Sequence, residues 1–348
     1  MKRSDRDRFF FVDMIEFPLG NLSKTLSEIV IVNTDKLKPD WAGDDLLSRF
    51  VNLLIKTKPF YSIMKGQARR VLISTAEKNG IPWRKNYQEL ANSEVKELYN
   101  AIADAELVYP DYYQVPFHAY DEGNLCWQAA FEAESATLSM GLRVWKNEPG
   151  LTWQVAQDRL RNSFYQIVEK YTNNPLQDIL DIGCSVGIST LALHRYFSAQ
   201  QDLPITTIGL DLSPYMLAVA KKRDEQQEIS QWFHSKAEKT KFADNSFDLV
   251  TLQFLVHELP RKATQEIFTE MFRILRPGGV IAIVDNNPAS PVIQNLPPVL
   301  FTLMKSTEPW SDDYYTFNIE QSLVDTGFNY QTTVASDPRH RAIIAIKS

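Results

Sequence analysis

Residues 178–187 read Asp-Ile-Leu-Asp-Ile-Gly-Cys-Ser-Val-Gly, a short apolar run that ends in a turn with two glycines. The aliphatic residues of the run predict a strand that is buried on both faces of a sheet. Gly183 and Gly187 allow the backbone to turn tightly and leave space for a ligand to approach it. Residues 188–197 predict a helix directly after the turn. A strand, a glycine turn and a helix in this order are typical of the first unit of a nucleotide-binding α/β domain.

The glycine turn does not fit the two commonest phosphate-binding patterns. A dinucleotide fingerprint requires Gly-x-Gly-x-x-Gly, but Ser185 stands at the second glycine and Ile188 at the third. The chain has no Gly-Lys-Ser or Gly-Lys-Thr for a P-loop. Asp181 instead precedes Gly183 by two residues, and a carboxylate there suits a ligand with a positive end. A nicotinamide-dependent oxidoreductase is the alternative on fold alone, and Ser185 with Ile188 argues against it.

A second strand is predicted at residues 205–210, and Asp211 follows it directly. Asp211 lies 24 residues after Gly187, near the offset of about 20 residues at which an acidic side chain binds ribose hydroxyls. Ser213 and Pro214 predict the start of a helix, with a capping hydroxyl followed by proline at the first helical position. We favour ribose binding for Asp211, and the alternative is that it caps this helix.

The rest of the chain predicts further strands of the same sheet, at residues 231–234, 248–252, 280–284, 328–334 and 341–346. The last two are predicted as a closing hairpin with the alternation of an edge pair. Helices are predicted at residues 152–171 and 261–275, and the second is terminated by Arg276-Pro-Gly-Gly279.

An acidic residue before Gly-x-Gly-x-Gly is motif I of the class I S-adenosylmethionine-dependent methyltransferases, and Asp181 with its glycine turn resembles it. The phrase Ile274-Leu-Arg-Pro-Gly-Gly-Val280 resembles a further signature of this family. The ordered motifs from about residue 176 to 285 therefore resemble the family throughout. The resemblance implies an α/β fold with a doubly wound, seven-stranded sheet, S-adenosylmethionine as cofactor, and methyl transfer as the reaction.

The resemblance also implies cofactor contacts near the ends of the predicted strands. These are assigned to Asp181, Gly183, Cys184, Ser185, Gly187, Asp211, Leu212, Met216, Ala237, Glu238 and Gln253. Two positions depart from the family pattern. Ser185 replaces the middle glycine of motif I, and Lys236 replaces an aspartate that contacts the adenine amino group. These departures leave open a binding protein that keeps the fold and has lost turnover.

His257 and Glu258 follow the fourth predicted strand and are the candidate catalytic residues. An unperturbed imidazole titrates near pH ~6.5, so His257 is the candidate base for an acceptor that must lose a proton. Glu258 either orients His257 or serves as the base itself, and a structural role is the alternative for His257. Asp285, at the end of the fifth predicted strand, is a candidate substrate contact. The remaining histidines show no metal-ligand spacing, so no metal is predicted.

The sequence predicts a mostly helical N-terminal cap at residues 1–150 and an S-adenosylmethionine-binding domain at residues 151–348. Helices of the cap are predicted at residues 46–55, 63–77, 87–107 and 131–145. Between the last two, residues 109–127 are rich in aromatics and interrupted by proline and glycine, which predicts an irregular loop. Tyr113, His118 and Tyr120 are candidate substrate contacts if this loop closes over the site. A surface loop that packs on the core through its rings is the alternative.

Composition limits the class of partner. The net charge of −6 and the pI near 5.5 argue against binding to bulk nucleic acid. Two cysteines form no disulfide framework, and no apolar run is long enough for a signal peptide or a membrane span. We therefore expect a cytoplasmic protein that methylates a small apolar or aromatic molecule, with an RNA or protein methyltransferase as the alternative. The sequence does not indicate an oligomeric state.

Overall fold

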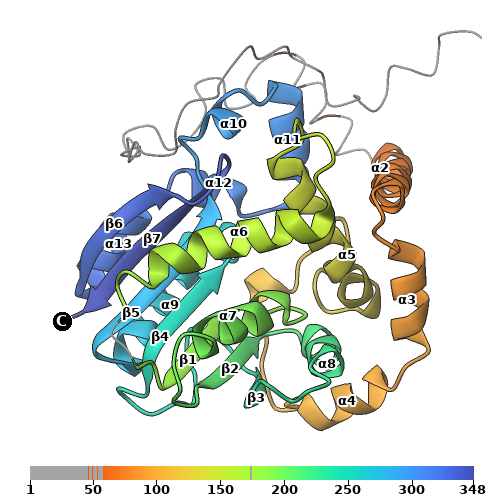
Figure 1. The fold of residues 1–348 in the computed structure, drawn as a ribbon. Helices are drawn as coiled ribbons and strands as arrows, with labels where there is room; N and C mark the ends of the chain where they lie inside the picture. The colour runs from red at the N-terminus through yellow and green to blue at the C-terminus, as the bar shows by residue number, and fades with distance from the viewer. Residues whose placement is uncertain (1–45, 47–48, 50–52, 54–57, 173–174) are drawn as a thin grey trace, which may run out of the picture.

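The computed structural model describes residues 58–172 and 175–348, together with Leu46, Arg49 and Leu53. The described chain forms a seven-stranded sheet with helices on both faces and a further group of helices beside it (Figure 1). The helix predicted at residues 46–55 lies largely outside the described residues. The helix predicted at residues 63–77 corresponds to α2, which spans Lys58–Lys78.

The strands are arranged in the order β3-β2-β1-β4-β5-β7-β6. Their bounds are β1 Asp178–Ile182, β2 Thr206–Asp211, β3 Gln231–His234, β4 Phe247–Gln253, β5 Leu275–Asn286, β6 Phe328–Ala335 and β7 His340–Lys347. The first five pair in parallel, whereas β7 runs antiparallel to β5 and β6. The strand order reverses at β1, so a crevice for ligands is expected beyond the carboxyl ends of β1, β2 and β4. The predicted fold class is confirmed.

Successive residues of the central strands pack against opposite layers of helices. Ile179 of β1 lies in a cluster with α6 and α7, whereas Leu180 lies in a cluster with α9 and α13. These helices span α6 Trp153–Val168, α7 Ile188–Ser198, α9 Arg261–Ile274 and α13 Ile319–Thr326, and α8 at Pro214–Arg223 covers β2 and β3. Because both faces of the sheet are covered, the strands read as continuous apolar runs.

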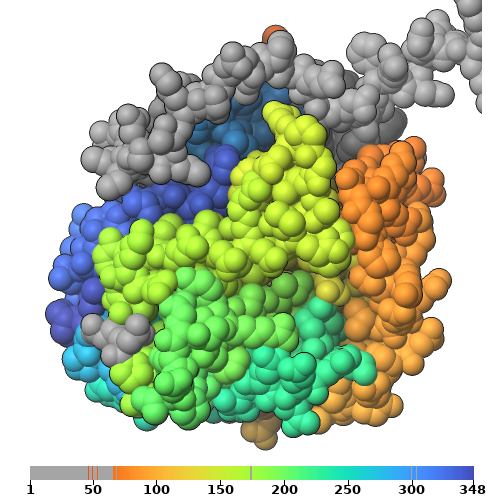
Figure 2. Space-filling model, viewed as in Figure 1, coloured from red at the N-terminus to blue at the C-terminus, as the bar shows by residue number. Residues whose placement is uncertain are grey.

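The N-terminal helices pack against the end of the sheet that carries α8. They are α3 Trp83–Ala91, α4 Val95–Ile102 and α5 Trp127–Val144. One apolar cluster joins Val95 of α4 and Phe131 of α5 to Val186 in the glycine turn and Met216 of α8. In the space-filling view the orange segment from α2 to α4 lies directly against the green segment that contains α8 (Figure 2). The cap helices therefore share a core with the first βα unit.

Two expectations about element boundaries were wrong. The predicted helix at residues 87–107 is two helices: α3 ends at Ala91, and the Ser93 hydroxyl donates to the Leu90 carbonyl in the turn before α4 begins. The Arg-Pro-Gly-Gly segment starts β5 itself, with an irregular register opposite Phe247. The predicted closing hairpin is confirmed: β6 and β7 pair in antiparallel fashion at one end of the sheet, with β6 at the edge and β7 between β5 and β6.

The segment after β5 is more helical than its prolines predict. It contains α10 Pro291–Gln294, α11 Pro298–Thr307 and α12 Ser311–Tyr315. Pro291 and Pro298 occupy first helical positions, where the missing N–H has no intrahelical partner to lose. Among the described residues, none of the helices has the length and apolar character needed to cross a membrane.

Candidate active site

A cavity of about 880 Å³ lies beyond the carboxyl ends of β1, β2 and β4. Its walls come from the glycine turn, the loops after β2, β3 and β4, the loop at residues 109–127, and helices α5 and α11. The volume is within the range of about 300–1,000 Å³ that is usual for small-molecule sites. The cap and the sheet therefore enclose one site together.

The glycine turn has a backbone that only small residues can follow. Gly183 has a φ of +68°, and a Cβ there would lie 2.7 Å from Leu255. Gly187 has a φ of +78°, and a Cβ there would lie 2.5 Å from Trp232. Ser185 also has a left-handed φ, of 49°. Its N–H donates to the Asp211 carboxylate over 2.8 Å, which holds this strained residue in place. The serine that departs from motif I thus keeps the conformation a glycine would have.

Asp181 and Asp211 are buried carboxylates at the ends of β1 and β2. Asp181 accepts hydrogen bonds from Thr190 and Thr251 at 2.6 Å each and from Gln253 at 3.1 Å. Burial raises the pKa of Asp181, and these donors oppose the shift. Asp181 therefore ties β1, α7 and β4 together at the cavity wall.

Asp211 accepts the N–H groups of Ser185 and Ser213 at 2.8 Å each and lines the cavity. Burial raises its pKa to about 6, so the carboxylate is ionised at neutral pH. The N-terminal cap of α8 is formed by the Ser213 hydroxyl, which accepts the Met216 N–H. Asp211 thus supports the turn while still presenting a carboxylate to the cavity.

The loop after β3 contributes Ala237 and Glu238 to the cavity wall, whereas Lys236 is absent from it. The Glu238 carboxylate accepts the Tyr112 hydroxyl over 2.5 Å through Oε1. Its other oxygen, Oε2, is buried and has no hydrogen-bond partner among the described residues. Such an oxygen suits a donor on a bound ligand, because an unsatisfied buried acceptor is costly.

His257 lies in a short 3₁₀ helix, η2 at Val256–Glu258, and is paired with Asp285. The distance from His257 Nδ1 to Asp285 Oδ1 is 2.8 Å, and the backbone N–H of His257 donates to Asp285 Oδ2 over 3.1 Å. Burial alone lowers the pKa of His257, but the charge and hydrogen bond of Asp285 prevail and raise it to about 10. The imidazole is therefore protonated at neutral pH and cannot accept a proton there.

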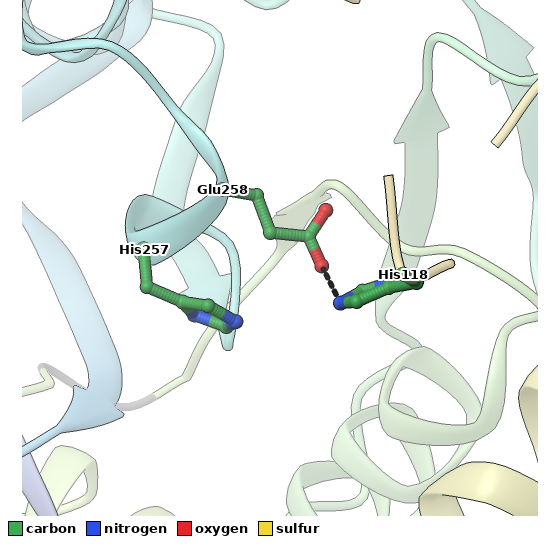
Figure 3. A group of neighbouring side chains, drawn as sticks. All are labelled: His118, His257 and Glu258. Atoms are coloured by element: carbon green, nitrogen blue, oxygen red, sulfur yellow. Dashed lines mark ion pairs between the residues drawn. The ribbon is translucent and has the colours of Figure 1, made fainter. Parts of the chain in front are cut away.

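Glu258 and His118 lie next to each other in the cavity wall, with His118 Nε2 3.5 Å from Glu258 Oε1 (Figure 3). Burial raises the pKa of Glu258 to about 8. The enclosure of the cavity and the nearby positive charge of His257 lower the pKa of His118, whose side chain is 39% exposed, so its imidazole is neutral at pH 7. Of the two predicted catalytic residues, Glu258 has the pKa that suits a base near neutral pH.

The aromatic loop is irregular, as predicted, and is fixed at its tip. His118 and Ala119 have left-handed φ of 49° and 66°, and Phe117 pairs with Tyr120 across this turn. The His118 N–H donates to the carbonyl of Thr307 at the end of α11 over 2.9 Å. Tyr113, which is partly buried, also lines the cavity. The alternative of a loop that merely covers the surface is disfavoured by this position.

Most of the predicted site residues line the cavity, and two do not. Gly187 packs on Trp232 behind the turn, and Asp285 lies behind His257 with its side chain fully buried. Their roles as cofactor and substrate contacts remain predictions. Sequence reasoning also missed residues of the cavity wall, chiefly Arg69, Tyr112, Glu132, Arg143, Glu308 and Arg339. The helix α5 has two glutamates among mostly apolar residues, Glu132 and Glu134, and only the structure shows that Glu132 is the one at the cavity.

The central part of the chain is similar to known methyltransferases. Residues 180–283 match the family model described as a methyltransferase domain. The matched residues form a methyltransferase domain. A demethylmenaquinone methyltransferase from Lactiplantibacillus plantarum is 36% identical to it over 120 residues, which cover 33% of this chain and 48% of that protein. An uncharacterized methyltransferase from Synechocystis sp. is 34% identical over 123 residues, covering 35% and 53%.

The chain therefore spans about half the length of the curated relatives it matches. Among solved structures, an S-adenosylmethionine-dependent methyltransferase from Aquifex aeolicus aligns with a TM-score of 0.41 and 16% identity, over 60% of this chain and 98% of that one. The cavity fits S-adenosylmethionine, the cofactor that the sequence predicts, since Asp211 and the unpartnered oxygen of Glu238 supply acceptors for hydroxyl and amino groups.

Proposed function

We propose that this chain transfers a methyl group from S-adenosylmethionine to a small-molecule acceptor, and that the reaction takes place in the cytoplasm. The observation that carries the proposal is one cavity with two chemically distinct ends. The end at Asp211 and Glu238 offers acceptors for a nucleoside, and the end at Glu258 and His118 offers a base. The relatives named demethylmenaquinone methyltransferases support an acceptor of the quinone kind.

The cofactor supplies an activated methyl group on a sulfonium. The protein has to hold the two reactants at near-attack distance and exclude water, and such positioning contributes about 7–11 kcal/mol to lowering the barrier. We assign proton removal from the acceptor to Glu258, because the pKa of about 8 leaves a partly ionised carboxylate near neutral pH. His257, held protonated by Asp285, serves as a fixed cation that stabilises negative charge on the acceptor.

We further propose that residues 1–150 act as the acceptor-binding cap and residues 151–348 as the cofactor-binding domain. In support, the described part of the cap contributes Tyr113, His118 and Met140 to the cavity wall. Tyr113 and Met140 offer apolar surface, which favours an acceptor with an apolar or aromatic body. Tyr120 is a weaker candidate contact, because its hydroxyl donates to Glu132 over 2.7 Å.

Isothermal titration with S-adenosylmethionine and S-adenosylhomocysteine tests the cofactor assignment. We expect micromolar binding to the wild type, and a loss of affinity of about 10-fold or more in Asp211→Asn, because a charge-assisted hydrogen bond contributes about 1.5–3 kcal/mol. Asp202→Asn, in an exposed loop, is the matched control and should bind like the wild type. An absence of binding by either ligand would overturn the proposal.

A second measurement separates an enzyme from a binding protein. S-adenosylhomocysteine formation is followed with a panel of quinols, phenols and other small apolar acceptors, with RNA and protein substrates included for comparison. Turnover with a small acceptor supports the proposal. Cofactor binding without turnover on any substrate would leave a binding protein instead.

A further inference from the structure

Three side chains with metal-ligating atoms converge at the acceptor end of the cavity. The residues are His118, His257 and Glu258. Each histidine offers one ring nitrogen and Glu258 offers one carboxylate oxygen, and these three atoms all lie within 4.8 Å of one another. His118 comes from the cap loop, whereas His257 and Glu258 come from η2. His257 follows His118 by 139 residues along the chain. Figure 3 shows the Glu258 carboxylate reaching in between the two imidazoles.

The spacing of these atoms is close to that of a metal site. Tetrahedral coordination with bonds of about 2.0–2.2 Å separates neighbouring ligand atoms by about 3.4 Å. His118 Nε2 and Glu258 Oε1 are already 3.5 Å apart. Neither side chain is fully buried, since His118 is 39% and Glu258 19% exposed, so both have room to adjust.

Buried groups behind the cluster orient its histidines. Nδ1 of His257 is 2.8 Å from Asp285 Oδ1, and the carboxylate of Asp285 is fully buried. This bond leaves Nε2 as the ring nitrogen available to the cavity, which is the carboxylate–histidine–metal arrangement found behind many metal ligands. His118 is fixed by its left-handed backbone and its N–H bond to Thr307, and its ring stacks edge-on against Phe117 at 4.2 Å.

We propose that His118, His257 and Glu258 bind one divalent transition metal ion, of the zinc, cobalt or ferrous class. Two imidazole nitrogens and one carboxylate oxygen favour these ions over magnesium and calcium, which prefer oxygen ligands. Three protein ligands leave at least one coordination position open toward the cavity. That position would take an oxygen of the acceptor, a role that rests on the proposed function, whereas metal binding itself does not. In the metal-bound site the ion would replace the proton on His257 Nε2 and supply the positive charge there, so the roles of His257 as a cation and of Glu258 as a free base belong to the metal-free site.

Titration with cobalt(II) tests the site directly. The full-length protein is treated with a chelator, dialysed, and titrated with Co²⁺ while visible absorption and bound metal per chain are recorded. We expect one Co²⁺ ion to bind per chain, with d–d absorption bands typical of a low coordination number. Added Zn²⁺ should displace the Co²⁺ and abolish these bands. Because the ligands must be deprotonated, affinity should fall as the pH is lowered.

Two variants identify the ligands. His118→Ala and the isosteric Glu258→Gln should each weaken Co²⁺ binding at least 10-fold, with circular dichroism confirming that they are folded. His194→Ala is the control, because His194 lies on α7 and bonds to Thr207 and Ser198, outside the cavity wall. No Co²⁺ binding, or binding that both ligand variants retain, overturns the metal site.

S-adenosylhomocysteine is titrated into the same samples. Binding of S-adenosylhomocysteine without binding of Co²⁺ refutes the metal site and leaves the proposed function standing. Co²⁺ binding without S-adenosylhomocysteine binding upholds the metal site and refutes the proposed function. The two proposals are therefore tested independently.

Discussion

The two ends of the cavity are built in different ways. The cofactor end is a continuous stretch, in which β1 leads through the glycine turn into α7, and β2 supplies Asp211 beside it. The acceptor end is assembled from the cap loop, η2, the end of β5 and α11. The first end depends on backbone shape, and the second depends on pairs of side chains from distant segments. Substitutions at the two ends should therefore fail in different ways.

Gly187→Ala should have the largest effect, because it tests backbone shape at the cofactor end. A Cβ there would lie 2.5 Å from buried Trp232, at a φ of +78°. Left-handed strain and overpacking together should lower the free energy of unfolding by about 2–5 kcal/mol, measured by urea denaturation. Gly80→Ala is the matched control, with φ of +79° and nothing within 4 Å of the added Cβ. Equal losses in the two variants would show that strain alone matters and packing on Trp232 does not.

Asp285→Asn tests the side-chain pairs of the acceptor end. It leaves the His257 imidazole buried without its charged partner, which should cost about 3 kcal/mol of stability and lower the pKa of His257 from about 10 to below its ordinary value. Histidine resonances followed by NMR through a pH titration measure the shift. Asp337→Asn removes the 2.7 Å partner of His340 instead and should leave the titration of His257 unchanged.

The loss in Asp285→Asn should depend on pH. The pKa of His257 is raised in the folded state, so its contribution is present below pH ~6.5 and is lost as the pH rises through about 10. The pKa of Asp285 is lowered, so its contribution is present above pH ~4 and is lost in acid. The stability difference from the wild type should be greatest between pH ~4 and ~6.5. A difference that grows toward pH 10 would contradict the pairing.

Glu258→Gln asks whether function at the acceptor end costs stability. The folded-state pKa of about 8 is above the ordinary value, so the wild type should lose stability as the pH rises from about 4 to about 8. The variant should escape this loss and exceed the wild type at pH 9 by on the order of 2 kcal/mol, while methyl transfer falls at least ~100-fold. Glu106→Gln, at an exposed position, is the control. A variant less stable than the wild type at pH 9 would show that the carboxylate is stabilised in place.

Ser185→Gly should have the smallest effect, and it returns the turn to the family pattern. Glycine adopts φ of 49° without the Cβ penalty, so stability should rise by about 1 kcal/mol or less, seen as a higher melting temperature. Ser163→Gly within α6 is the opposite control and should lose about 0.5 kcal/mol. A loss of stability in Ser185→Gly would show that the serine side chain itself supports the turn.

Residue patterns that act over a few positions were sufficient to predict the sheet and the cofactor end. Alternation, glycine placement and capping residues predicted each strand from residue 178 to residue 346, with errors at boundaries such as the start of β5. Of the predicted cofactor residues, Gly187 alone is outside the cavity wall. The split of the helix at residues 87–107 was missed, because α3 ends at Ala91 in a turn held by local hydrogen bonds, such as that from the Ser93 hydroxyl to the Leu90 carbonyl, which periodicity does not reveal.

By itself the sequence determined the fold, the glycine turn and the acidic ends of β1 and β2, because these depend on backbone geometry and on neighbouring residues. Only the tertiary structure decided the chemistry of the acceptor end. It placed Asp285 behind His257, which makes that histidine a cation, and it brought His118 to Glu258 from the cap. Burial and charge pairing act between segments that are distant along the chain, so the protonation states and the proposed metal ligands follow from packing.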